Sequence, residues 1–169
     1  ATIKLSHAVL PNMISKRRGT IINVSSLSAC FPVPGAAMYS ATRAFLVSFT
    51  ESIYLELKVT GVNVQALFPG TTMTDFHKKL GFDTTDYYKN RGIIRSLTTD
   101  QVVKSSLKYI KKDKVLCIPG VFNHFLWIAF KLIPRKLTYS VVRLMMKKRN
   151  NIKRSKIAIP NLQKYYLAS

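Results

Sequence analysis

The sequence predicts an α/β fold built around a parallel sheet. Short runs of β-branched and other apolar residues occupy 20–25, 62–68 and 115–118, and segments with apolar residues at helical spacing lie between them. A helix between two such strands makes a parallel, right-handed crossover. Hydrophobic residues make up 47% of the 169 residues, which excludes disorder as a description of the chain.

The first half of the chain predicts helix, strand and helix in turn. Apolar spacing predicts a helix over 1–16, which we expect to close with two arginines followed by Gly19. The β-branched run 20–25 predicts a buried strand, and prolines predict a loop over 26–35. A long helix over 37–58 has apolar residues on more than one side, so we expect it to be covered on two sides.

The second half predicts two further strands and a helix between them. A strand over 62–68 ends at Pro69-Gly70, and ligands of open parallel sheets bind at the carboxyl ends of strands. A polar segment follows over 71–97. Thr98 and its neighbours Thr99 and Asp100 offer an N-cap for a helix over 101–111, and a third strand is expected over 115–118.

Positive charge is concentrated in the second half of the chain. The formal net charge is +20, and residues 77–169 hold 21 Lys and Arg against four Asp and Glu. Two basic apolar helices are expected over 121–133 and 135–149, with a poorly ordered tail from 150. We therefore divide the chain into residues 1–120 and a basic C-terminal part, 121–169.

The basic C-terminal part allows two interpretations. Apolar residues around Trp127 together with Lys and Arg are typical of helices on an anionic membrane surface. The alternative is a dimer or substrate-cap element of a soluble enzyme. No zinc-finger, RNP or helix-turn-helix pattern accompanies the charge, so specific nucleic-acid binding is not expected.

Cysteine and histidine usage predicts neither a disulfide framework nor a metal site. Cys30 and Cys117 are too few for a scaffold, and the three histidines have no ligand spacing. Reduced, unpaired thiols fit a reducing compartment, so we expect a cytoplasmic protein, with a peripheral membrane location as the alternative. No apolar run is long enough for a classical transmembrane helix.

Three side chains at one end of the predicted sheet point to proton transfer. Ser26 follows the strand over 20–25, while Tyr39 and Arg43 lie one turn apart on the helix over 37–58. A phenol with an ordinary pKa near 10 is a poor acid–base group at neutral pH, and a cation within about 4–6 Å lowers that pKa. The pattern thus predicts a hydroxyl, a phenol and a cation around one carbonyl oxygen.

The same residues resemble a known enzyme family. The segments GTIINVSS, PVPGAAMYSATRAF and VNVQALFPGTTMT are similar to the second half of a classical short-chain dehydrogenase/reductase. The similarity covers residues 1 to about 76, and more loosely the rest, where ketoacyl and steroid reductases are the nearest likeness. It implies a Rossmann-like, doubly wound parallel sheet and NAD- or NADP-dependent interconversion of a carbonyl and an alcohol.

The resemblance also implies residue roles. Ser26 matches the substrate-orienting serine, Tyr39 the catalytic acid–base, and Arg43 stands where the family has a lysine. The residues it implies for the cofactor are Tyr39, Arg43, Pro69, Gly70, Thr72 and Thr74. The family's substrate-covering loop matches residues 73–97, whose aromatic residues favour an apolar, lipid-like substrate: Phe76, Phe82, Tyr87 and Tyr88.

Two departures from the family pattern shape the expectation for this chain. Arg43 keeps the charge of the lysine but does not release its proton, so we expect weakened turnover or none. The glycine-rich nucleotide loop is absent from the 169 residues, so we expect a fragment or truncated product, with an open sheet edge at 20–25 and poor dinucleotide binding. The alternative function is a catalytically impaired interaction or membrane module, and self-association is expected through 37–58.

Overall fold

The chain forms a three-stranded parallel sheet with helices on both faces, which confirms the predicted α/β fold. The computed structural model describes residues 1–75 and 96–153. The strands are β1 (Gly19–Val24), β2 (Val62–Leu67) and β3 (Leu116–Cys117), and they lie in the order β1-β2-β3. Ile21 pairs with Val64 in the β1–β2 register, and β2 pairs with β3 in the same direction.

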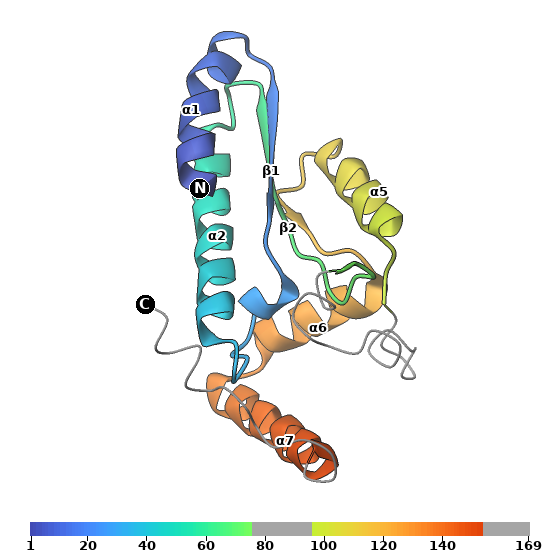
Figure 1. Ribbon diagram of the computed structural model, residues 1–169. Coiled ribbons are helices and arrows are strands. Elements are labelled where there is room, and N and C mark those ends of the chain that lie inside the picture. Colours follow the sequence, from blue (N-terminus) through green and yellow to red (C-terminus); the bar gives the residue numbers. More distant parts are fainter. Residues whose placement is uncertain (76–95, 154–169) are drawn as a thin grey trace.

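Helices enclose the sheet in a three-layer arrangement. α1 (Thr2–Ser15) and α2 (Ala37–Glu56) lie on one face, and α5 (Thr99–Ile110) lies on the other (Figure 1). β2 is therefore buried on both faces, and Val64 and Ala66 are almost completely enclosed. This layering explains why five of its six residues are buried, including the polar Gln65.

The core consists of apolar clusters on the two faces of the sheet. Ile53 and Leu57 of α2 pack with Val64, whereas Val102 of α5 packs with Cys117. A further cluster joins the loop after β1 to the end of the sheet and contains Leu27, Ala66, Phe68 and Ile118. The ends of all three strands are therefore anchored in the core, which gives the candidate site a rigid base.

A buried polar contact fixes α2 against β1. Asn23 Nδ2 donates a hydrogen bond of 2.9 Å to Thr50 Oγ1, and Thr50 Oγ1 donates to the Leu46 carbonyl at 2.6 Å. All the polar atoms involved have partners, as buried polar groups require.

The end of α1 differs from the prediction. Gly19 is already the first residue of β1, and the left-handed residue at the turn is Arg17, with φ 48°. A glycine is required instead at Gly61, in the neighbouring turn just before β2. Its φ is 81°, and a Cβ there would meet the Arg17 carbonyl oxygen. The packing between two turns, and not the local helix-end pattern, therefore decides which residue takes the left-handed conformation.

The outer face of α2 is exposed within the described chain. Phe45 and Leu55 lie largely in solvent, while Leu46, Thr50 and Ile53 face the sheet. The expectation that α2 is covered on two sides is therefore wrong for the described residues. In residues 1–75 and 96–153, no further layer of structure packs against this outer side of α2.

β1 lies at an edge of the sheet, as expected from the sequence. Among the described residues it pairs only with β2. Val24, at its carboxyl end, is 52% exposed.

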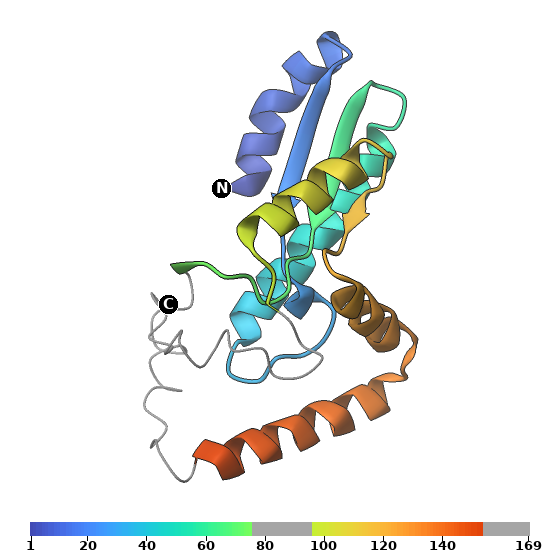
Figure 2. The ribbon, with the colours of Figure 1, turned by 90° about the vertical axis from the view of Figure 1, so that its right-hand side faces the viewer.

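Two helices follow β3. α6 (Val121–Leu132) begins after Gly120 and packs on the end of the sheet, and α7 (Arg135–Lys153) extends away beyond it (Figure 2). The helix continues through residues 150–153, so the expected start of an irregular tail at 150 is corrected. The expected substrate-covering residues Phe76, Phe82, Tyr87 and Tyr88 lie outside the described residues.

Candidate active site

Ser26 lies directly after the carboxyl end of β1, as predicted. It caps a short 3-10 turn, η1 (Leu27–Ala29), which sequence reasoning had placed within a loop. The Ser28 backbone N–H donates to Ser26 Oγ at 3.2 Å. Because the hydroxyl accepts this bond, its own proton is left to be donated to another oxygen.

Tyr39 and Arg43 share one face at the start of α2, as their spacing predicted. The Arg43 Cζ atom lies 5.0 Å from the centroid of the Tyr39 ring. Tyr39 is 38% exposed, so a bound molecule can reach it. The guanidinium therefore stands beside a phenol that is open to a ligand.

Arg43 is fixed by the backbone of β1. Its Nη1 donates to the Val24 carbonyl at 3.0 Å, and Ser25 Oγ donates to the Arg43 carbonyl at 2.9 Å. These two bonds hold the carboxyl end of β1 against the second turn of α2. The sequence indicated Arg43 as a cation beside Tyr39 and as a cofactor contact, but it did not indicate this bond to the backbone.

Three buried polar atoms around the site lack a partner. Arg43 Nε, Ser40 Oγ and Ser28 Oγ have no hydrogen-bond partner among the described residues. The part of the site that a ligand can reach is the half-exposed Tyr39 with the Arg43 guanidinium beside its ring. A cation beside a tyrosine suits a polar ligand such as the hydroxyl-bearing ribose of a dinucleotide, so this end of the site fits such a cofactor.

The loop after β2 lies at the same end of the sheet. The Leu27 N–H donates to the Pro69 carbonyl at 3.1 Å, which ties this loop to η1. A Cβ on Gly70 would come within 2.5 Å of Asn123 Nδ2, so the glycine lets the loop pack closely against α6. Asn123 itself donates to the Pro119 carbonyl at 2.7 Å.

The two threonines of this loop lie in different settings. Thr72 forms an isolated parallel bridge with Leu97, and its Oγ1 donates to the Gly70 carbonyl at 3.2 Å. Thr74 is exposed, two positions further along. The bond from Thr72 makes the turn after Gly70 rigid, and Leu97 brings the start of α5 to the same place.

The two cysteines, Cys30 and Cys117, are free thiols. Burial raises the pKa of the Cys30 thiol to about 11 against a smaller, lowering effect of Lys131, and burial alone raises that of Cys117 to about 11. Both thiols therefore hold their protons at neutral pH and are poor nucleophiles.

A parallel sheet with a crossover helix and helices on both faces is the arrangement of a Rossmann-like domain. A family model described as short chain dehydrogenase matches residues 1–84. The chain belongs to the short-chain dehydrogenase/reductase family.

Curated relatives extend the similarity beyond the catalytic segment. The chain is 32% identical over 161 residues to 17-beta-hydroxysteroid dehydrogenase type 3 of Rattus norvegicus, which covers 94% of this chain and 49% of the relative. It is 32% identical over 143 residues to the very-long-chain 3-oxoacyl-CoA reductase of the same species, covering 77% of this chain and 41% of the relative. The chain thus spans about half the length of the curated relatives it matches.

A solved structure supports the fold independently. A short-chain dehydrogenase from Sphingobium yanoikuyae in complex with NADPH is similar with a TM-score of 0.64, at 22% identity. The match covers 97% of this chain and 56% of the solved one. At that identity the likeness establishes the Rossmann-like arrangement of the elements.

Proposed function

We propose that the chain carries the catalytic part of an NAD- or NADP-dependent enzyme that interconverts a carbonyl and an alcohol. The observation that carries the proposal is the fixed pairing of Arg43 with Tyr39 beside the Ser26 end of β1. An ordinary surface pair on a helix would not be held by the carbonyl of a neighbouring strand.

Each of the three side chains has a distinct part in the proposed reaction. Tyr39 donates its phenolic proton to the carbonyl oxygen during reduction and takes it back during oxidation. The Ser26 hydroxyl donates a hydrogen bond to the same oxygen and orients it. The guanidinium of Arg43 stabilises the negative charge that develops on the Tyr39 oxygen as the proton leaves.

The proposed cofactor is NADP or NAD. When bound, its nicotinamide supplies or accepts the hydride. Arg43 and Tyr39 would hold the ribose hydroxyls, and the residues proposed to hold the nicotinamide side of the cofactor are Pro69, Gly70, Thr72 and Thr74. The NADPH complex of the Sphingobium yanoikuyae protein supports this choice for a chain of the same fold.

An apolar, lipid-like carbonyl compound is the proposed substrate. The curated relatives are named for a hydroxysteroid and for a very-long-chain 3-oxoacyl-CoA. The first carries a hydroxyl group and the second a ketone, each on a large apolar body, and the two groups are the two sides of the proposed reaction. The aromatic residues between Phe76 and Tyr88 in the sequence favour the same chemistry.

Turnover of a steroid ketone and of a 3-oxoacyl thioester, followed by NADPH absorbance, tests the proposed function. Tyr39→Phe removes the proton donor and is expected to lower kcat about 100-fold or more. Ser26→Ala is expected to lower kcat as well, whereas Ser52→Ala, on the exposed side of the same helix α2, serves as the matched control. Turnover by Tyr39→Phe at the parent rate would show that the phenol does not transfer the proton.

We also propose that the segment 121–169 binds an anionic membrane surface while residues 1–120 carry the chemistry. Val121, Phe125 and Leu132 form an exposed apolar stripe on α6, with Val121 91% exposed. No acidic residue occurs between 121 and 153. The basic residues near this stripe in the sequence are Lys131, Arg135, Lys136 and Arg143. Each such residue contributes about 1 kcal/mol near an anionic surface.

The stripe would lie on the surface, and not cross it. None of the helices in the described ranges is long and apolar enough to span a membrane. Lys131 Nζ lies 4.9 Å from the Trp127 ring centroid, a pair suited to the interface between headgroups and acyl chains.

Co-sedimentation with phosphatidylserine and phosphatidylcholine vesicles separates this membrane interpretation from a soluble cap or dimer element. Binding is expected only to the anionic vesicles and is expected to fall with Phe125→Asp. Leu5→Asp is the matched control, because Leu5 on α1 and Phe125 are both 65% exposed. Equal loss in the two variants would contradict a specific role for α6.

The exposed side of α2 supports a third proposal, self-association. Phe45 and Leu55 lie on the outer face of this helix and are largely exposed. Burying them between two copies would remove apolar surface from water. Sedimentation velocity of the parent and of Leu55→Glu tests this, with a shift toward monomer expected for the variant.

A further inference from the structure

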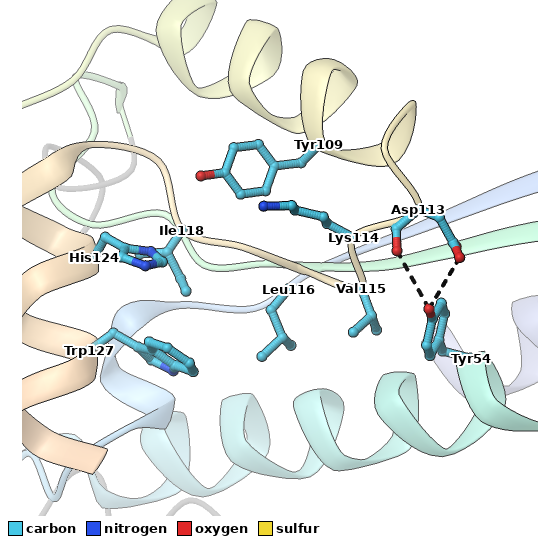
Figure 3. A pocket seen from close by; sticks show the side chains of 9 residues that line it. All are labelled: Tyr54, Tyr109, Asp113, Lys114, Val115, Leu116, Ile118, His124 and Trp127. Atoms are coloured by element: carbon cyan, nitrogen blue, oxygen red, sulfur yellow. Dashed lines mark hydrogen bonds between the residues drawn. The ribbon is translucent and has the colours of Figure 1, made fainter. Parts of the chain in front are cut away.

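A cavity lies apart from the candidate active site. It has a volume of about 410 Å³ and opens between α2, β3, the end of α5 and α6 (Figure 3). Tyr54 of α2 lines this cavity. At the usual helical rise per residue, Tyr54 lies about 22 Å along α2 from Tyr39. No part of the proposed reaction uses this cavity.

The cavity has an apolar base and aromatic sides. Val115, Leu116 and Ile118 line it from β3 and the residues beside that strand. Tyr109 lines it from α5 and Trp127 from α6 (Figure 3). Its volume falls in the range of small-molecule sites, and flat rings pack well between such side chains.

A cation lies at one side of the cavity. Lys114 Nζ is 5.4 Å from the centroid of the Tyr109 ring, and Figure 3 shows the lysine extending along that ring toward the end where His124 and Trp127 lie. The carboxylate of the lining is Asp113, whose Oδ2 accepts a hydrogen bond of 3.3 Å from the Tyr54 hydroxyl at the opposite end. Lys114 has no carboxylate partner among the described residues. The positive charge of Lys114 therefore favours an anionic ligand at this end of the cavity.

An imidazole lies at the end of the cavity toward which Lys114 extends. His124 and Trp127 both line the cavity there, and their ring centroids lie 5.7 Å apart. His124 Nδ1 is buried and has no hydrogen-bond partner in the described part of the chain. The imidazole therefore adds a polar group beside the indole at this end of the cavity.

We propose that this cavity binds a small aromatic anion, a flat apolar ring that carries a carboxylate or sulfonate. The ring lies against Trp127 and Leu116, and the anionic group lies between Lys114 and His124. The inference does not depend on the proposed oxidoreductase function, because it uses no residue of that site.

Trp127 gives a direct readout of occupancy, since it is the one tryptophan of the chain. Titration with para-nitrobenzoate, an aromatic anion that quenches indole fluorescence, is expected to give saturable quenching. The neutral para-nitrobenzyl alcohol is expected to bind about fivefold more weakly or worse, because it lacks the charge that Lys114 meets. Free N-acetyltryptophanamide measures the collisional quenching to be subtracted.

Two lysine variants distinguish the site from general anion attraction by a chain of net charge +20. Lys114→Met is expected to weaken para-nitrobenzoate binding about fivefold and to leave the alcohol unaffected. Lys108→Met, which removes an exposed lysine of α5 that does not line the cavity, is expected to change neither. Quenching that does not saturate, or equal effects of the two variants, would overturn the proposal.

A third variant tests the place of binding. Leu116→Phe fills the cavity with a larger ring and is expected to abolish saturable quenching by both probes. Unchanged far-ultraviolet circular dichroism shows that the variant is folded. Retained binding by folded Leu116→Phe would place the ligand elsewhere and refute the inference.

Discussion

The contact between Asn23 and Thr50 offers a quantitative test of how β1 and α2 are held together. Thr50→Val keeps the shape of the side chain but removes the hydroxyl. The Asn23 amide then loses the acceptor at 2.9 Å, in a position that is completely enclosed, since Thr50 is 0% exposed. The Leu46 carbonyl still accepts the helical N–H of residue 50, so the loss falls on Asn23.

The expected magnitude follows from the unsatisfied amide. Leaving a buried polar group without its partner costs about 1–3 kcal/mol. With an m-value of about 2 kcal/mol/M in urea, the unfolding midpoint is expected to fall by about 0.5–1.5 M. Replacing both partners, in Asn23→Leu with Thr50→Val, is expected to recover much of this loss because no polar group is then stranded.

Urea unfolding followed by far-ultraviolet circular dichroism measures the effect. Thr42→Val is the matched control on the same helix, because its hydroxyl donates to the Tyr39 carbonyl at an exposed position. We expect it to change stability by less than about 0.5 kcal/mol. A Thr50→Val midpoint within about 0.2 M of the parent would refute the reasoning.

Four further outcomes are expected. Arg43→Lys introduces a side chain that can release a proton, so kcat for carbonyl reduction is expected to rise in the turnover assay. Gly61→Ala is expected to lower the melting temperature in calorimetry, at a cost of about 1–3 kcal/mol, because φ is 81° and the Arg17 carbonyl stands in the way. Iodoacetamide is expected to label Cys30 and Cys117 slowly below pH 9.0, the ordinary thiol pKa, and increasingly toward about 11, as measured by mass spectrometry. Because the folded pKa of each thiol is raised, the unfolding free energy is expected to fall as pH rises from 9.0 toward about 11, since the unfolded chain loses these protons first.

The order of the elements could be predicted because each has a local cause. β-branched runs produced the strands, and apolar spacing produced the helices. Thr98 caps α5 as expected, and its partner Gln101 completes a reciprocal capping box. The shared face of Tyr39 and Arg43 also follows from helical spacing alone.

Contacts between distant segments could not be predicted in this way. The bond from Arg43 to Val24 depends on how far α2 lies from the end of β1, which spacing does not encode. The packing of Gly70 on Asn123 has the same origin, since α6 returns to the sheet more than 50 residues later. For the same reason the left-handed residue fell at Arg17, where local preference had favoured glycine.

The bond from Arg43 to Val24 also bears on the free edge of the sheet. The Ser25 N–H donates to the Leu67 carbonyl of β2, so Val24, one residue earlier, directs its carbonyl outward. Arg43 thus covers an acceptor that an added strand would use. Lateral growth of the sheet past this point and retention of the guanidinium beside Tyr39 compete for one oxygen atom. A partner strand that paired with β1 as far as Val24 would displace Arg43 from the Val24 carbonyl. Strand pairing at this edge would thereby be linked to the cation beside Tyr39.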